Sequence, residues 1–184
     1  LKSIIITLFI SDDEVKNLVD DNVLVKPKGS RWNAETEART LASLIALRKA
    51  VNIYNINHSV TFHSSIAKAD AFMQSQEPFT EKYKQFSSVD AFHVAGSMPT
   101  AQRSKVIDAF STSKKAIITN ARCLTEGINV PDLDAVAFID PKQSPVDIVQ
   151  AVGRAIRKND EKKFGIIFLP LFIKQEDYQK YKKS

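Results

Sequence analysis

Short apolar runs alternate with longer amphipathic segments along the chain, and this alternation restricts the possible fold more than any other feature. Residues 3–10 form a continuous apolar run, typical of a strand buried on both faces of a sheet. Further strands are predicted at 23–25, 60–63, 89–94, 116–118, 135–139 and 165–169. Helices are predicted over 13–19, 34–54, 66–74, 78–86, 99–110 and 145–158. The pattern predicts an α/β fold, with an open, mainly parallel sheet and helices on both faces.

The 184 residues are predicted to form a single domain. It comprises an N-terminal strand, loop and long helix (1–57), a core (58–170) and a polar C-terminal helix (171–184). The apolar run near the N-terminus is too short to cross a membrane, and no small-residue cleavage site follows it, so we expect no membrane partner. The single cysteine, Cys123, cannot form an internal disulfide, which indicates a reducing, cytoplasmic setting.

Polar residues follow four of the predicted strands. The carboxyl ends of parallel strands share one edge of the sheet, where ligands bind in open α/β folds. The residues in question are His63, Ser64, Ser65, Gly96, Ser97, Met98, Thr119, Asn120, Asp140, Pro141 and Lys142. Hydroxyls, amides and a glycine suit contacts with phosphate oxygens, although turn residues are also common at strand ends. The net charge of +5 permits a nucleic-acid partner without requiring one.

The sequence lacks the residues that several kinds of binding and catalytic site require. The five glycines are at least 12 residues apart, so neither a dinucleotide-binding GxGxxG nor a phosphate-binding GxxxxGK[ST] loop can be built. His58, His63 and His93 have no cysteine or carboxylate partners at metal-ligand spacing, so no metal site is predicted. No nucleophile elbow accompanies the Ser, His and Asp residues. A dehydrogenase of the dinucleotide-binding type is therefore excluded.

The predicted helix at 145–158 presents two arginines on one face. Gln150, Arg154 and Arg157 stand at i, i+4 and i+7, so at about 3.6 residues per turn all three point the same way. Arginine binds phosphate bidentately and stays charged at physiological pH. By itself, this helix face could either bind a polyanion or be an ordinary solvent-exposed surface.

Four stretches together resemble the motifs of superfamily 2 helicases and translocases. TNARCLTEGINVP (119–131) and QAVGRAIRK (150–158) resemble motifs V and VI. VTFHSSIAKADAF (60–72) resembles motif IV, and AGSMPTAQRSKVIDAF (95–110) resembles the glycine-then-QxxR region between them. Their order and spacing are similar to those of the second RecA-like domain, over roughly 58–170. The form of motifs V and VI is most similar to DEAD/DEAH-type helicases of bacterial restriction-like systems.

The resemblance implies roles for particular residues. The arginines Arg154 and Arg157, with Gln150, would be catalytic and reach across a cleft to the γ-phosphate of ATP. The nucleotide-binding positions implied are Glu126, Gly127, Asn129 and Gly153. The nucleic-acid-binding positions implied are Ser64, Arg103, Thr119 and Asn120. Asn129 stands where many relatives have Asp, Thr100 where the QxxR pattern has Gln, and Gln150 where RNA-remodelling DEAD-box proteins have His.

The implied function is that of the C-terminal motor domain of an ATP-dependent helicase or translocase. ATP and Mg²⁺ would be held mainly by a first RecA-like domain, which carries the phosphate loop that this sequence lacks. The chain begins at Leu1, so it is expected to be a monomeric fragment that does not hydrolyse ATP alone. Its nucleic-acid partner is expected to be DNA rather than RNA. Two alternatives stay open: a duplex DNA translocase that does not unwind, and a non-catalytic nucleic-acid-binding module.

Overall fold

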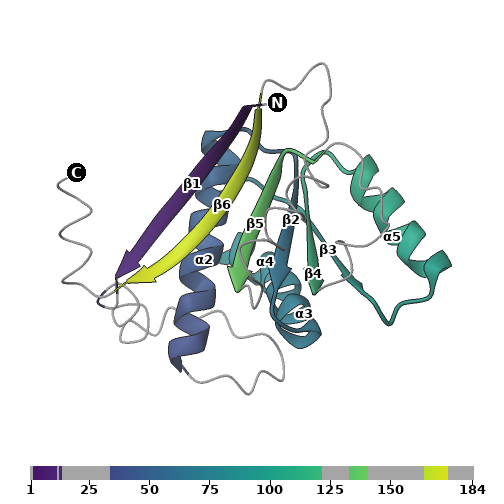
Figure 1. Cartoon of the computed structure of the whole chain (residues 1–184), viewed down its shortest axis with the longest axis horizontal. Coiled ribbons are helices and arrows are strands. Elements are labelled where there is room, and N and C mark those ends of the chain that lie inside the picture. Colours follow the sequence, from purple (N-terminus) through teal and green to yellow (C-terminus); the bar gives the residue numbers. More distant parts are fainter. Residues whose placement is uncertain (1, 12, 14–33, 122–132, 141–163, 174–184) are drawn as a thin grey trace.

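The computed structural model describes residues 2–11, 13, 34–121, 133–140 and 164–173 (Figure 1). Within these ranges the chain forms a six-stranded sheet in the order β1-β6-β5-β2-β4-β3. The strands are β1 Lys2–Ser11, β2 His58–His63, β3 Asp90–Ala95, β4 Ala116–Ala121, β5 Ala135–Asp140 and β6 Phe164–Ile173. Every described strand pair is parallel. The predicted parallel α/β sheet is confirmed.

Helices cover both faces of the sheet. They are α2 Ala34–Ile53, α3 Ile66–Gln74, α4 Gln76–Lys82 and α5 Thr100–Thr112. Strand β5 shows how the hydrophobic core is divided between the two faces of the sheet, because alternate side chains of a strand point to opposite faces. Ala135, Ala137 and Ile139 pack into the core formed with α2, α3 and α4, whereas Val136 and Phe138 pack into the core formed with α5. The sheet is therefore buried on both sides, as its apolar strands predict.

The predicted boundaries of several elements differ from the observed ones. The helix predicted at 78–86 is α4, which begins at Gln76, directly after the Ser75 that caps α3. Strand β4 continues to Ala121, so Thr119 and Asn120 lie inside the strand and not in a turn after it. The register of β4 with β2 and β3 extends over both residues, which explains why their polarity does not end the strand. Likewise β5 includes Asp140, and β6 runs to Ile173.

Some predicted elements lie outside the described residues. They are the strand at 23–25, the helix at 145–158, the C-terminal helix at 171–184 beyond residue 173, and all but Asp13 of the helix at 13–19. Among the residues that are described, no helix is long and apolar enough to span a membrane.

Candidate nucleic-acid interface

Strands β2, β3, β4 and β5 bring distant parts of the sequence together at their carboxyl ends. His63 of β2 is in register with Asp140 of β5, and Phe62 is in register with Asn120 of β4. On the other side of β4, Val94 of β3 is also paired with Asn120. Segments separated by dozens of residues therefore meet at one edge of the sheet. The polar residues at the ends of these strands were predicted to share this edge.

Asp140 is the centre of a charged cluster at this edge. Its Oδ2 accepts a hydrogen bond from Ser64 Oγ at 2.5 Å and forms an ion pair with Lys68 Nζ. Partial burial alone would raise the pKa of Asp140, but the hydrogen bonds from Lys68 and Ser64 outweigh it and hold the pKa below its usual value. The carboxylate thus stays ionised at neutral pH. It connects the end of β5 to the first turn of α3.

The start of α3 is ordered by a local cap. Ser65 has extended backbone geometry, and its Oγ accepts a hydrogen bond from Lys68 N at 3.2 Å. The cap sets the direction in which α3 leaves β2, and hence the position of Lys68 one turn into the helix. Lys68 was not among the predicted site residues. A basic residue in the first turn of a helix that follows a strand end is the sequence signal that could have indicated it.

Two histidines at the same edge are uncharged at neutral pH. His63 is buried against the ring of Phe72, and its Nε2 is 2.9 Å from Thr61 Oγ1. Burial lowers the pKa of His63 to about 3, against the opposing influence of Asp140. Burial also lowers the pKa of His93, whose Nδ1 is 2.9 Å from Thr119 Oγ1. Neither imidazole can therefore act as a cation toward a phosphate, whereas Lys68, among the residues described at this edge, carries a positive charge.

The four predicted nucleic-acid-binding residues have different surroundings. Ser64 is 8% exposed and its hydroxyl donates to Asp140, while Thr119 and Asn120 are 0% exposed within β4. Arg103 is half-buried on α5, and its Nη2 donates to the carbonyl of Met98 at 3.2 Å. Its Nε is buried and has no hydrogen-bond partner in the described parts of the chain. Ser64, Thr119 and Asn120 come together at the edge, and their direct contact with nucleic acid stays a prediction.

The predicted catalytic and nucleotide-binding residues lie outside the described residues. They are Gln150, Arg154, Arg157, Glu126, Gly127, Asn129 and Gly153. Their roles stay predictions. In the ranges that are described, no group of three or more His, Cys, Asp or Glu side chains is arranged to hold a metal ion.

A parallel sheet covered by helices on both faces, with a polar carboxyl edge, is the architecture of a RecA-like motor domain. Residues 42–159 match the family model described as the helicase conserved C-terminal domain. The chain belongs to this family of helicase C-terminal domains. This confirms the resemblance drawn from the four motifs.

Curated relatives are similar to this chain over part of their length. A probable helicase, A859L, of African swine fever virus is 29% identical over 143 residues, which cover 77% of this chain and 16% of the relative. DEAD-box ATP-dependent RNA helicase 51 of Arabidopsis thaliana is 25% identical over 137 residues, which cover 74% of this chain and 21% of the relative. The chain therefore spans less than a quarter of the length of these relatives.

Solved structures share the fold. The DNA-bound ATP-dependent Type ISP restriction-modification enzyme LlaBIII aligns with 96% of this chain and 12% of its own, with a TM-score of 0.72 and 24% identity. Domain 2 of the DEAD-box helicase Mss116p, bound to an RNA duplex, aligns with 89% of this chain and 54% of its own, with a TM-score of 0.55 and 11% identity. At these identities the likeness shows the fold alone.

Proposed function

We propose that this chain is the C-terminal motor domain of an ATP-dependent helicase or translocase acting on nucleic acid. The observation that carries the proposal is the family match over residues 42–159, which includes both QAVGRAIRK and the strands that form the polar edge. The sequence lacks a phosphate-binding loop of its own, so ATP and Mg²⁺ are held mainly by a first RecA-like domain. The single cysteine supports a cytoplasmic setting.

The proposed chemical role is carried by Arg154 and Arg157. ATP bound by the first domain supplies the phosphoryl group, and negative charge develops on it during transfer to water. Arginines that arrive from a second domain neutralise this charge only when the two domains close. Hydrolysis is thereby coupled to domain motion, and the motion moves the protein along a strand.

Nucleic acid is proposed to bind along the carboxyl edge of the sheet. Lys68 and Arg103 offer the positive charge for backbone phosphates. Ser64 and Lys68 both contact the carboxylate of Asp140, and Thr119 of β4 is proposed as a further contact. Contacts of this kind position a strand without reading its bases, so binding should tolerate many sequences and weaken with salt. DNA is the proposed partner, because the form of motifs V and VI is similar to that in bacterial restriction-like systems.

The test uses a polypeptide that joins this domain to its first RecA-like domain. Arg157→Lys keeps the charge but loses the planar fork, so kcat for ATP hydrolysis should fall by roughly 10³-fold, with a much smaller change in ATP affinity. Lys158→Ala is the matched control, because it removes a neighbouring charge outside the i, i+4, i+7 series, and it should leave kcat nearly unchanged. Near-normal turnover by Arg157→Lys would contradict the catalytic role.

The domain by itself should bind nucleic acid weakly and show no ATPase activity above background. Turnover by the 184 residues alone at about 1 s⁻¹ or more, an ordinary enzymatic rate, would overturn the two-domain mechanism.

A second candidate function is a duplex DNA translocase that does not separate strands. It is favoured by the form of TNARCLTEGINVP and QAVGRAIRK, which is similar to that in bacterial restriction-like systems. Displacement of a triplex-forming strand without separation of a duplex, by the two-domain polypeptide, would establish this alternative over an unwinding helicase.

A further inference from the structure

Asp140 carries a charge that opposes phosphate binding, although it lies within the proposed nucleic-acid interface. Its Oδ2 accepts hydrogen bonds from both Ser64 Oγ and Lys68 Nζ. Its side chain is 41% exposed, so the negative charge lies where a phosphate backbone is proposed to pass. A carboxylate in this position weakens the electrostatic attraction for a polyanion. Its contacts with Ser64 and Lys68 show how it can act on binding.

Ser64 holds the carboxylate from the buried side of the cluster. Ser64 is 8% exposed, and its hydroxyl donates to Asp140 Oδ2 at 2.5 Å. The backbone of Asp140 is also fixed, because it is the last residue of β5 and is in register with His63 of β2. A hydrogen bond of this kind favours the ionised carboxylate. Asp140 therefore keeps its position and its charge whether or not Lys68 is bound to it.

Lys68 is the partner that can leave the cluster. Its side chain is 37% exposed, and its backbone is held in the first turn of α3 by the Ser65 cap. The ammonium can therefore change partners by side-chain rotation alone, without movement of the helix. A partly exposed ion pair is also weak, so a phosphate can replace the carboxylate. Lys68 thus has two possible anionic partners, of which one is built into the fold.

A protein that moves along a strand must break its backbone contacts in order to advance. A lysine that binds only phosphate loses its counter-charge when the strand leaves, which slows dissociation. With Asp140 in place, the ammonium passes from the phosphate to the carboxylate, so its charge is neutralised in both states. We propose that Asp140 is a positioning residue for Lys68, which competes with backbone phosphate for the ammonium and so speeds release of the strand. This inference rests on the proposed function.

The test measures how tightly the 184-residue chain binds a fluorescein-labelled oligothymidylate, by fluorescence anisotropy at low salt. Asp140→Asn should tighten binding about two- to fivefold, which corresponds to the strength of a partly exposed ion pair. The gain should disappear at high salt, because salt screens exposed charges. Most of the gain should appear as slower dissociation when the complex is chased with unlabelled DNA.

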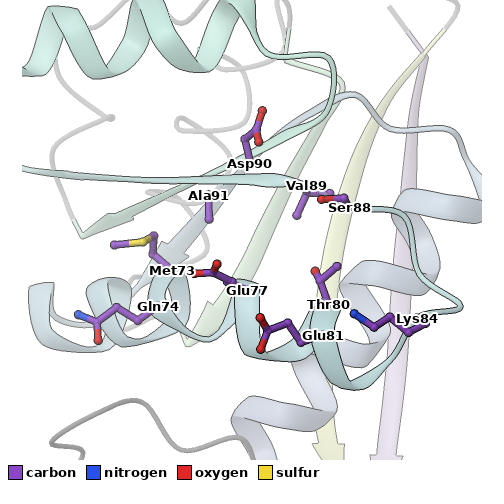
Figure 2. Close-up of a pocket in the computed structure, with 10 residues that line it drawn as sticks. All are labelled: Met73, Gln74, Glu77, Thr80, Glu81, Lys84, Ser88, Val89, Asp90 and Ala91. Atoms are coloured by element: carbon purple, nitrogen blue, oxygen red, sulfur yellow. The ribbon is translucent and has the colours of Figure 1, made fainter.

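Two further variants separate exchange at Lys68 from a general effect of charge. In the Lys68→Met background, Asp140→Asn should change the affinity by less than about twofold, because the two side chains act as a pair. Asp90→Asn is the matched control and should leave the affinity nearly unchanged. It removes the same charge from an exposed residue that begins β3, at the end of this strand away from the interface (Figure 2).

Melting temperatures check that each variant is folded, and Asp140→Ser supplies a second neutral side chain if asparagine disturbs the end of β5. The inference is overturned if Asp140→Asn does not tighten binding, if its effect is the same in the Lys68→Met background, or if Asp90→Asn has an equal effect. A gain confined to the association rate, which general steering of a polyanion produces, also overturns it. Absence of saturable DNA binding by the parent chain would instead contradict the proposed function, and with it this inference.

Discussion

Arg48 and Lys68 are two cationic side chains that join elements of this fold, and they do so in opposite ways. Arg48 is 1% exposed and donates to uncharged oxygens of Gln76, Thr80 and Ser87. Lys68 is 37% exposed at its side chain and is paired with the carboxylate of Asp140. Burial lowers the pKa of Arg48 to about 10, which leaves it charged at neutral pH. A buried cation held by dipoles stabilises the fold, whereas a partly exposed ion pair at the sheet edge is available to a ligand.

The largest effect on the free energy of unfolding is expected from substitution of Arg48. Arg48→Met keeps a long apolar stem but leaves the Gln76 and Thr80 side chains and the Ser87 carbonyl without their donor. Urea unfolding should show a loss of about 3–5 kcal/mol, the range for breaking a buried charged network. Lys49→Met, at the neighbouring exposed position of α2, should change the free energy of unfolding by less than about 0.5 kcal/mol. Equal losses in the two variants would show that the Arg48 network does not stabilise the fold.

The stability of the folded chain is expected to decrease as the pH falls, because of His63. Its pKa is about 3 in the folded chain, against 6.5 as the ordinary value, so between these pH values the unfolded chain binds the proton that the folded chain excludes. Stability therefore falls with pH over this window, by on the order of 3 kcal/mol between pH 6.5 and 4. His93 acts in the same direction, and Asp140 adds to the loss only once the pH falls below the ordinary range of a carboxyl group.

Unfolding of His63→Gln, measured across the same pH range, tests this assignment. The variant should lose most of the pH dependence above pH 4, because glutamine does not titrate. His93→Gln should remove a smaller part, since that side chain is only half-buried. A parent chain whose stability is constant from pH 6.5 to 4 would contradict burial of a neutral His63.

Asp140→Asn is expected to affect binding more than folding. The pair with Lys68 is partly exposed, so the loss of stability should be about 1 kcal/mol or less. The change removes a negative charge beside Lys68 at the proposed nucleic-acid interface. The affinity of the domain for a single-stranded DNA oligonucleotide, measured by fluorescence anisotropy at low salt, should therefore rise a few-fold. A fall in affinity would indicate that Asp140 is needed to orient Lys68.

The smallest effect on stability is expected for Lys68→Met, within about 0.5 kcal/mol, because the stem is retained and Asp140 keeps its bond from Ser64. Its effect on DNA affinity should have the opposite sign to that of Asp140→Asn, a loss of a few-fold that disappears at high salt. Unchanged affinity at low salt would exclude Lys68 from the interface.

The sequence by itself determined the class of fold and the family. Apolar runs such as 3–10 and 135–139 can be satisfied only by burial, and their alternation with helical segments required a covered parallel sheet. Helix α3 was predicted with its observed bounds, Ile66–Gln74. The four motifs carried the family, since their order along the chain needs no knowledge of the fold. Gln150, Arg154 and Arg157 stay predictions from that pattern.

Only the tertiary structure decided which residues meet at the site. The strand order β1-β6-β5-β2-β4-β3 places Asp140 beside Ser64, 76 positions away, and no local pattern encodes that pairing. Thr119 and Asn120 were expected in a turn after the strand because they are polar, but both are paired with β2 and β3 inside β4, and Thr119 Oγ1 is 2.9 Å from His93 Nδ1. Arg48 is a charged residue within α2, yet partners 28 to 39 positions away allow its burial. Sequence patterns report which side chains favour water, whereas the burial of a polar group depends on partners that only the folded chain brings within reach.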